Sequence, residues 1–187
     1  MNREQSFEVL KEHVKTKSLL KHCFAVEAAM RAYAKVFGED IDRWGMIGLM
    51  HDVDFEKHPE NHPNYAPQLL KGYDYDGDFV DTILSHGTGK EAMRNTRVRK
   101  CLFAVDKMAS FIVAVALMRP TRLEGLAAKS AKKKIKDKAF AKAVDREELI
   151  ASMEDLGMEL SEHVRIIVEG LSEHEAFLKE QGYSLFD

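Results

Sequence analysis

The sequence predicts an all-α protein, folded as a compact bundle of several helices. Apolar residues recur every three to four positions along most of the 187 residues, which is the period of amphipathic helices. Glycine or proline closes several of these stretches, as at Gly38 and Pro120, where such residues commonly end helices. No stretch has the strict polar and apolar alternation of a half-buried strand. We expect one domain over residues 1–187, with a core at about 19–120 and C-terminal helices at 121–182 packed on this core or appended to it.

The expected helices follow in order along the chain. An amphipathic stretch at 5–15 opens it, and Ser18 is placed to cap a long helix that ends at Gly38. Residues 53–64 lack a helical period and contain two prolines, so we expect a loop there. The remaining helices are expected at 41–51, 65–71, 78–86, 97–119, from Asp145 to Gly157, and from Ser161 to Gly182, and residues 129–142 are expected to be mostly helical. Thr121 and Glu124 are spaced as a capping box that starts one further turn.

Composition narrows the class of protein. Hydrophobic residues make up 45%, charged residues 32%, and the net charge is −3, which is typical of a soluble globular protein. No apolar run has the length of a membrane span, and the N-terminus lacks a secretory pattern. Cys23 and Cys101 lie in apolar helical patterns, which indicates buried thiols. We expect a cytoplasmic protein with no membrane partner; a homodimer is left open.

A run of lysines over residues 129–142 is the strongest local concentration of charge. Such a run binds polyanions in some proteins, and in others it is simply the solvated face of a helix. Acidic residues outnumber basic ones in the whole chain, 31 to 28, and the run lacks the series of interleaved aromatic residues that forms a stacking platform for single strands. We therefore favour the solvated face and do not expect nucleic acid as a partner.

The residues with the clearest chemistry are His51 and Asp52, at the end of the apolar stretch 41–51. An imidazole and a carboxylate side by side supply a nitrogen and an oxygen donor at one point, a pairing that suits a borderline divalent cation. His22 lies on the face of its helix that also carries Val26. Taken alone, it is also explained as a core histidine with a hydrogen-bond partner.

Asp106 falls on the core side of the most apolar helix, between Leu102 and Ala109. A carboxylate there needs a positive partner, either an arginine or a metal ion. His86 precedes Gly87 at the end of a predicted helix; it suits a metal ligand or a histidine that caps the helix end. Gly87 allows close backbone approach beside it. His62 precedes Pro63 and is either a ligand or a solvated loop residue.

Separate helices packed on one core would bring these side chains together. Mixed imidazole and carboxylate donors without cysteine suit divalent Mn, Fe, Zn, Co, Ni or Mg. The sequence therefore predicts a bound divalent metal ion as the cofactor, and whether one or two ions bind is left to the resemblance described next.

His22, then His51-Asp52, then Asp106, in this order on a helical chain, resemble the His…His-Asp…Asp signature of the HD-domain superfamily (HDIG-like) of metal-dependent phosphohydrolases. The segments around His62 and His86 resemble the extra histidine segments of its binuclear branch, which includes enzymes similar to symmetrical diadenosine tetraphosphate hydrolases. The resemblance implies a six-ligand metal site. Its members would be His22, His51, Asp52, His62, His86 and Asp106.

The resemblance also implies a reaction. Asp52 would bridge two cations, and a metal-activated water would attack the phosphorus of a nucleotide or another small phosphate ester. Lys57, Lys90 and Arg94 follow the ligand segments and are candidates to contact the phosphate; Lys57 is also a candidate catalytic residue. Asp54 or Glu56 would orient water or protonate the leaving group. Two alternatives stay open, a regulatory module that binds metal or nucleotide with little turnover and a purely structural helical module.

Overall fold

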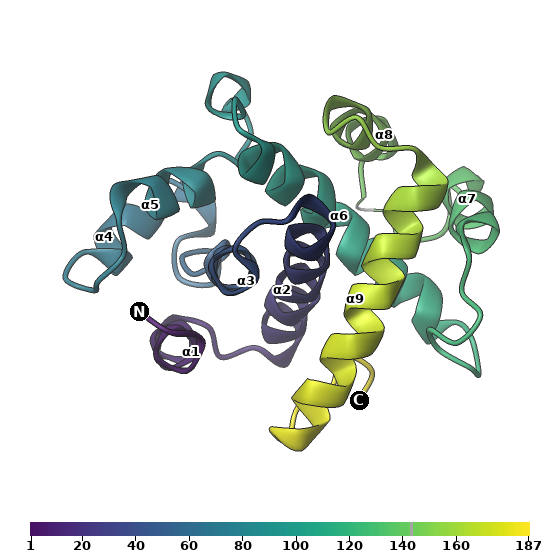
Figure 1. Cartoon of the computed structure of the whole chain (residues 1–187), viewed down its shortest axis with the longest axis horizontal. Coiled ribbons are helices and arrows are strands. Elements are labelled where there is room, and N and C mark those ends of the chain that lie inside the picture. The colour runs from purple at the N-terminus through teal and green to yellow at the C-terminus, as the bar shows by residue number, and fades with distance from the viewer. Residues whose placement is uncertain (143) are drawn as a thin grey trace.

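The computed structural model describes residues 1–142 and 144–187, and the fold within them is all-helical, as the sequence predicts (Figure 1). A single isolated bridge, between Lys71 and Tyr73, is the only β pairing in the described residues. The α-helices are α1 (Arg3–His13), α2 (Lys17–Phe37), α3 (Ile41–Met50), α4 (Ala66–Leu70), α5 (Gly77–Leu84), α6 (Arg97–Leu117), α7 (Ala128–Lys136), α8 (Arg146–Asp155) and α9 (Leu160–Glu180). Two short 3₁₀ helices are η1 (Pro59–Asn61) and η2 (Glu91–Met93).

Helix α2 is the centre of the fold and contacts α3, α6 and α9. Its residues 23–30 are all buried, so the helix is covered on every side rather than along one stripe. Two glycines allow its neighbours to approach closely. A Cβ on Gly48 of α3 would lie 2.8 Å from the carbonyl oxygen of Val26, and one on Gly170 of α9 would lie 2.6 Å from that of Ala28.

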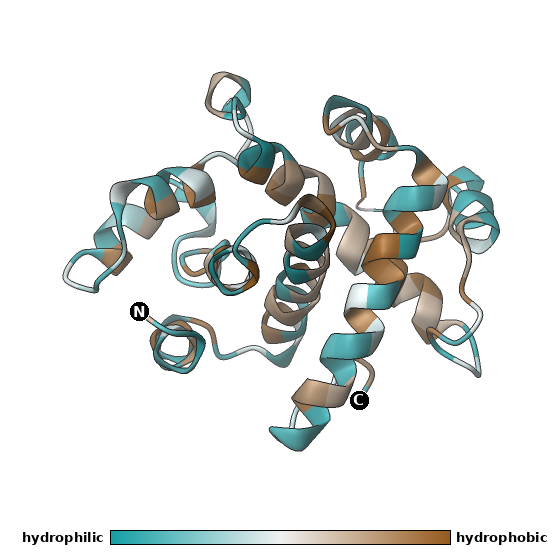
Figure 2. Ribbon diagram, viewed as in Figure 1, coloured by the Kyte–Doolittle hydropathy of each residue, from teal (hydrophilic) through white to brown (hydrophobic). Residues whose placement is uncertain are grey.

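The C-terminal helices share this core. Helix α9 packs along α2 and α6, α8 packs on α6, and α7 packs on α9 and α6. One continuous cluster of buried apolar side chains extends from Phe7 to Leu185. Figure 2 shows the apolar residues, in brown, gathered on α2, α6 and α9 where these helices meet. Helix α6 therefore packs against α2 and against the C-terminal helices, which fixes the positions of the polar side chains on its buried face.

Most predicted helices are confirmed to within two residues at each end. Helix α1 begins earlier than expected, because Asn2 and Gln5 form a reciprocal capping box with both hydrogen bonds at 2.9 Å. The sequence contains this signal at Asn2-Arg3-Glu4-Gln5. Gly38 ends α2 in the left-handed region, with φ 70°, as expected, and the side chain of Asp145 caps α8 by accepting from the amides of Glu147 and Glu148.

Three predicted helix starts are wrong. Helices α2 and α9 each begin one residue before Ser18 and Ser161, because the carbonyls of Thr16 and Glu159 accept the first helical hydrogen bonds. The Thr121 hydroxyl donates to the Glu124 carbonyl at 3.2 Å and caps no helix. The chain turns there until α7 begins.

The lysine-rich segment 129–142, expected to be mostly helical, is helical as far as Lys136, where α7 ends. Ala131 packs inward, while Lys129, Lys132, Lys133 and Lys136 are exposed. Lys134 pairs with Asp137, just past the helix end, at 3.0 Å. This arrangement agrees with a solvated helix face.

Both cysteines are free thiols and buried, as expected. None of the helices in the described residues combines the length and apolarity that crossing a bilayer requires.

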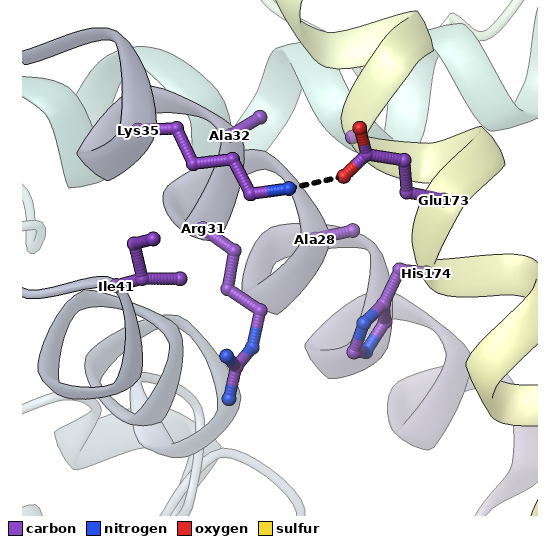
Figure 3. A pocket seen from close by; sticks show the side chains of 8 residues that line it. Ala28, Arg31, Ala32, Lys35, Ile41, Glu173 and His174 are labelled. Atoms are coloured by element: carbon purple, nitrogen blue, oxygen red, sulfur yellow. Dashed lines mark hydrogen bonds and ion pairs between the residues drawn. The ribbon is translucent and has the colours of Figure 1, made fainter.

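A buried carboxylate joins three helices near the N-terminus. Glu27 of α2 is fully buried and accepts two hydrogen bonds from the guanidinium of Arg3 in α1, at 2.6 and 2.9 Å. Arg31, one turn along α2, donates at 3.0 Å. The Nε2 of His174 in α9 lies 3.1 Å away, in close contact but poorly aligned for a hydrogen bond. Arg31 and His174 also line a small pocket between α2 and α9 (Figure 3).

Burial raises the pKa of Glu27, but contacts with His174 and Arg3 outweigh it and lower the pKa from 4.5 to about 2. Because the folded pKa is depressed, the resulting stability is present above pH 4.5 and is lost as the pH falls through 2. We expect Glu27→Gln to lower the free energy of unfolding at pH 7 by about 3–5 kcal/mol, since it leaves the largely buried guanidinium of Arg3 without its counter-charge. Urea unfolding at pH 7 and at lower pH measures both effects.

The difference between Glu27→Gln and the wild type should shrink as the pH falls through that window, because protonated Glu27 resembles glutamine. Glu173→Gln is the control, since Glu173 pairs with Lys35 at the surface and exposed pairs contribute little. Equal destabilisation by both variants would contradict the assignment.

Candidate metal centre

All six predicted ligands meet at one place, where α2, α3 and α6 and the segments after α3 and α5 converge. Their first half consists of His22, His51 and Asp106. The Nε2 atoms of His22 and His51 lie 3.0 Å apart. Asp106 Oδ1 lies 3.1 Å from the first and 3.5 Å from the second. Asp106 thus meets two histidines here, rather than the arginine that the sequence left open.

The second half consists of His62, His86 and Asp52. The Nε2 atoms of His62 and His86 lie 3.0 Å apart, and Asp52 Oδ1 lies 3.3 and 3.5 Å from them. Its other oxygen, Oδ2, lies 3.3 Å from His22 Nε2, and Oδ1 lies 3.4 Å from His51. Asp52 therefore stands between the two halves and faces both.

Close backbone packing determines this convergence. Gly48 allows α3 to lie against α2, and His51, directly after α3, is thereby brought to His22. In the second half a Cβ on Gly87 would lie 2.5 Å from Pro63 Cδ. The absence of that Cβ allows the segments of His62 and His86 to touch. The expected close approach at Gly87 is confirmed.

The outer nitrogen of each imidazole is held by an oxygen. His51 Nδ1 donates to the Gly48 carbonyl at 2.8 Å, and His86 Nδ1 donates to the Ile83 carbonyl at 2.5 Å. His62 Nδ1 lies 2.6 Å from the carboxylate of Asp54, and His22 Nδ1 lies 2.6 Å from the Ser110 hydroxyl. At His51, His62 and His86 this oxygen can only accept, which keeps the proton on Nδ1 and turns the Nε2 lone pair inward, as in histidines that bind metals.

The inner nitrogens fit a cation rather than one another. His62 and His86 both donate from Nδ1, so in their neutral forms both Nε2 atoms present lone pairs across 3.0 Å. Two lone pairs in contact repel unless a proton or a metal ion lies between them. Two carboxylates beside four imidazoles add negative charge. This donor set fits one or two divalent ions.

The charges around the cluster favour a cation. Burial lowers the pKa of His22, but Asp106 and Asp52 outweigh it and raise the pKa from 6.5 to about 10. Burial raises the pKa of Asp52, but His51, His22 and His86 hold it well below its usual value. The pKa of Asp106 is likewise lowered, mainly by His22 and His51 against the effect of burial. Charges that hold a proton on an imidazole also attract a divalent ion, which would compete with that proton.

Two of the three predicted phosphate contacts do not face the cluster. Lys57 is exposed, and its ammonium donates to the Glu12 carbonyl at 3.0 Å and lies 3.2 Å from His13. Arg94 is buried, and its guanidinium donates to the Ser85 carbonyl at 3.0 Å. Long cationic side chains can donate to many nearby carbonyls, and the spacing of residues in the sequence does not reveal which carbonyl is bound.

Lys90 is the third predicted phosphate contact. Its Cγ would lie 3.5 Å from a Cβ on Gly87, so its stem runs beside the His86 segment. It forms no ion pair with the described residues. Of the three predicted cations, Lys90 is therefore the one that no ion pair or hydrogen bond in the described residues ties to another group.

Asp54 and Glu56, one of which was expected to orient water or protonate the leaving group, both contact groups of the protein instead. Asp54 is fully buried and holds His62, and its second oxygen accepts from the Tyr65 amide at 3.1 Å. Glu56 accepts from the amides of Lys15 and Thr16. Both carboxylates thus position protein groups. Ser110, which the sequence analysis missed, lies one turn after Asp106, and this spacing could have indicated it.

We expect His51→Ala and Asp52→Ala each to remove bound divalent metal while far-UV circular dichroism shows unchanged helix content. Asp52 faces both halves, and His51 is one of the three donors of the first half, so each substitution leaves at least one half with an incomplete set of donors. Metal content after purification, measured by mass spectrometry of the elements, provides the test. His58→Ala is the control, because His58 stacks on Tyr65 outside the cluster. Full metal content in both site variants would rule out the assignment.

Arg94 holds the backbone on both sides of His86. It donates to the carbonyls of Ser85 and Gly87, at 3.0 and 3.3 Å, and its guanidinium lies 3.8 Å from the centre of the Phe103 ring. We expect Arg94→Lys to weaken Mn²⁺ binding about tenfold, as losses of groups that support ligands do. A lysine cannot make both hydrogen bonds and stack.

Isothermal titration calorimetry with Mn²⁺ measures this change. Arg97→Lys makes the same substitution three residues away, at an exposed arginine paired with Glu39. If the two variants bind Mn²⁺ equally well, Arg94 does not support the site.

Comparison with known proteins agrees with this geometry. The family model of the HD domain matches residues 19–110. This range contains all six clustered ligands and Ser110. No curated protein and no solved structure matches the chain. Together with the all-helical fold, the match supports assignment of residues 19–110 to the HD-domain superfamily.

Proposed function

We propose that this protein is a metal-dependent phosphohydrolase that acts on a nucleotide or another small phosphate ester. The observation that carries the proposal is the convergence of four imidazole Nε2 atoms and two carboxylates, with each imidazole anchored from behind. A helical module without a ligand has no physical need to bury so many donors at one point. HD domains commonly serve metal-dependent hydrolysis, which supports the same conclusion.

The arrangement favours two ions. His22, His51 and Asp106 would hold one, His62 and His86 would hold the other, and Asp52 would contribute an oxygen to each. Bound divalent ions would polarise a phosphoryl oxygen and lower the pKa of water, so that water attacks phosphorus at neutral pH. Binding of two ions would agree with the predicted binuclear branch.

The protein's own residues would keep the donors in place. Asp54, Ser110 and the carbonyls of Gly48 and Ile83 fix the direction of the imidazoles, which avoids reorganisation during the reaction. Lys90 would contact the phosphate, because its stem runs beside the His86 segment. We assign no catalytic role to Lys57, whose ammonium is held at the C-terminal end of α1.

The direct experiment is release of phosphate from a panel of substrates by the purified protein. The panel contains nucleoside mono-, di- and triphosphates, diadenosine tetraphosphate and p-nitrophenyl phosphate, each with Mn²⁺, Fe²⁺, Co²⁺, Ni²⁺, Zn²⁺ or Mg²⁺. We expect turnover that a chelator abolishes. Asp52→Asn should lower kcat/KM at least about a hundredfold, since it weakens the charge that both halves share.

His58→Ala should retain wild-type kcat/KM, because His58 lies outside the donors. Turnover that persists at the wild-type rate with chelator and with Asp52→Asn would refute the proposal. Nucleotide binding without turnover by the metal-loaded protein would instead favour a regulatory module.

A further inference from the structure

A pocket opens directly beside the metal centre. It has a volume of about 400 Å³ and is lined by Thr16, Ser18, Leu19, His22, Phe55, Glu56 and Pro59. His22 forms one wall of the pocket, and its Nε2 also faces Asp52 and Asp106. A molecule in this pocket therefore lies next to the donors. The volume is within the range of small-ligand sites.

Phe55 gives the pocket an aromatic surface. The two residues before it, Val53 and Asp54, are fully buried, whereas Phe55 is 43% exposed. Its ring meets the His62 ring edge to face, with 5.1 Å between centroids and 83° between planes. A ligand histidine thus supports one part of the ring while the rest is open. An exposed, supported ring of this kind is a stacking surface for a planar aromatic group.

The charge of the pocket indicates which part of a substrate it accepts. No lysine or arginine lines it, and its one carboxylate is Glu56. Glu56 is fixed by the amides of Lys15 and Thr16 and by the Thr16 hydroxyl, all at 2.9–3.0 Å. A fixed carboxylate repels additional phosphate groups. The phosphate is directed to the donors and Lys90, and the uncharged organic part is directed to the pocket.

We propose that Phe55 determines specificity by stacking on the aromatic group, such as a nucleobase, of a phosphate monoester whose phosphate lies at the metal centre. The inference rests on the proposed function and deepens it. It names the substrate class as aromatic or nucleoside monoesters, with no further phosphate on the side of the pocket.

A second pocket offers a control. It lies between α2, α3 and α9, has a volume of about 180 Å³, and begins at Ala28, more than one turn along α2 from His22 (Figure 3). Its cations are already paired, Arg31 with Glu27 and Lys35 with Glu173. Ile41 lines this pocket and is exposed to a similar degree as Phe55, 37% against 43%. Ile41→Ala therefore removes an exposed apolar side chain away from the donors.

Binding of two non-hydrolysable phosphonates to the Mn²⁺-loaded protein tests the inference. Isothermal titration calorimetry should show that phenylphosphonate binds about tenfold more tightly than methylphosphonate, the gain expected from aromatic stacking together with burial. Phe55→Leu keeps an apolar side chain but removes the ring, and it should reduce this preference to about twofold or less. Phe55→Tyr and Ile41→Ala should keep it.

The same comparison in catalysis uses kcat/KM for phenyl phosphate and for glycerol 2-phosphate. The ratio of the two values should fall in Phe55→Leu and stay at the wild-type level in Ile41→Ala. Equal binding of both phosphonates by the wild-type protein, or an unchanged preference in Phe55→Leu, overturns the role of Phe55 even where phosphatase activity is present. Absence of all turnover and of all phosphonate binding would instead overturn the proposed function.

Discussion

The constraint on which this structure depends is the cost of holding four imidazoles and two carboxylates together away from bulk water. Each group alone would lower its free energy by turning to solvent. They stay inward because every imidazole is tied through Nδ1 to an oxygen of the fold, and because their helices are locked into one apolar core. The residues that face the donors are thus only half of the site. The oxygens behind them decide which nitrogen carries a proton, and so which nitrogen presents a lone pair.

Two places where a side chain is absent shape the site as strongly as the ligands do. At Gly48 the backbone of α3 comes so close to α2 that any Cβ would meet Val26 and Glu27 backbone atoms below 3 Å. At Gly87 the same is true of the Pro63 ring. The first contact joins His22 to His51, and the second joins His62 to His86. Backbone proximity therefore determines the spacing of both halves, and Asp52 connects them.

Much of this could be predicted from the sequence, for identifiable reasons. The all-helical fold follows from periodicity, and His22 and Asp106 are noticeable because polar residues are costly on apolar faces. The superfamily resemblance agrees with the match over residues 19–110, whereas the diadenosine tetraphosphate branch and the substrate stay predictions. Lys57 and Arg94 could not be placed, since a long side chain has many carbonyls within reach. The contact of Glu27 with Arg3 and His174 joins elements far apart in the chain, which local patterns do not reveal.

The two sides of the metal centre differ in a way that bears on how a substrate would enter. His51 is fully buried and His86 nearly so, and both donate to main-chain carbonyls. The side chains of His22 and His62 are 20% and 15% exposed, and each is backed by a side chain, Ser110 or Asp54. These two more accessible imidazoles are the ones that border the Phe55 pocket, His22 as a wall and His62 as the support of the ring. The buried pair therefore provides rigidity, while the accessible pair places the donors within reach of a bound molecule. A cluster that served only to stabilise the fold would gain nothing from this division.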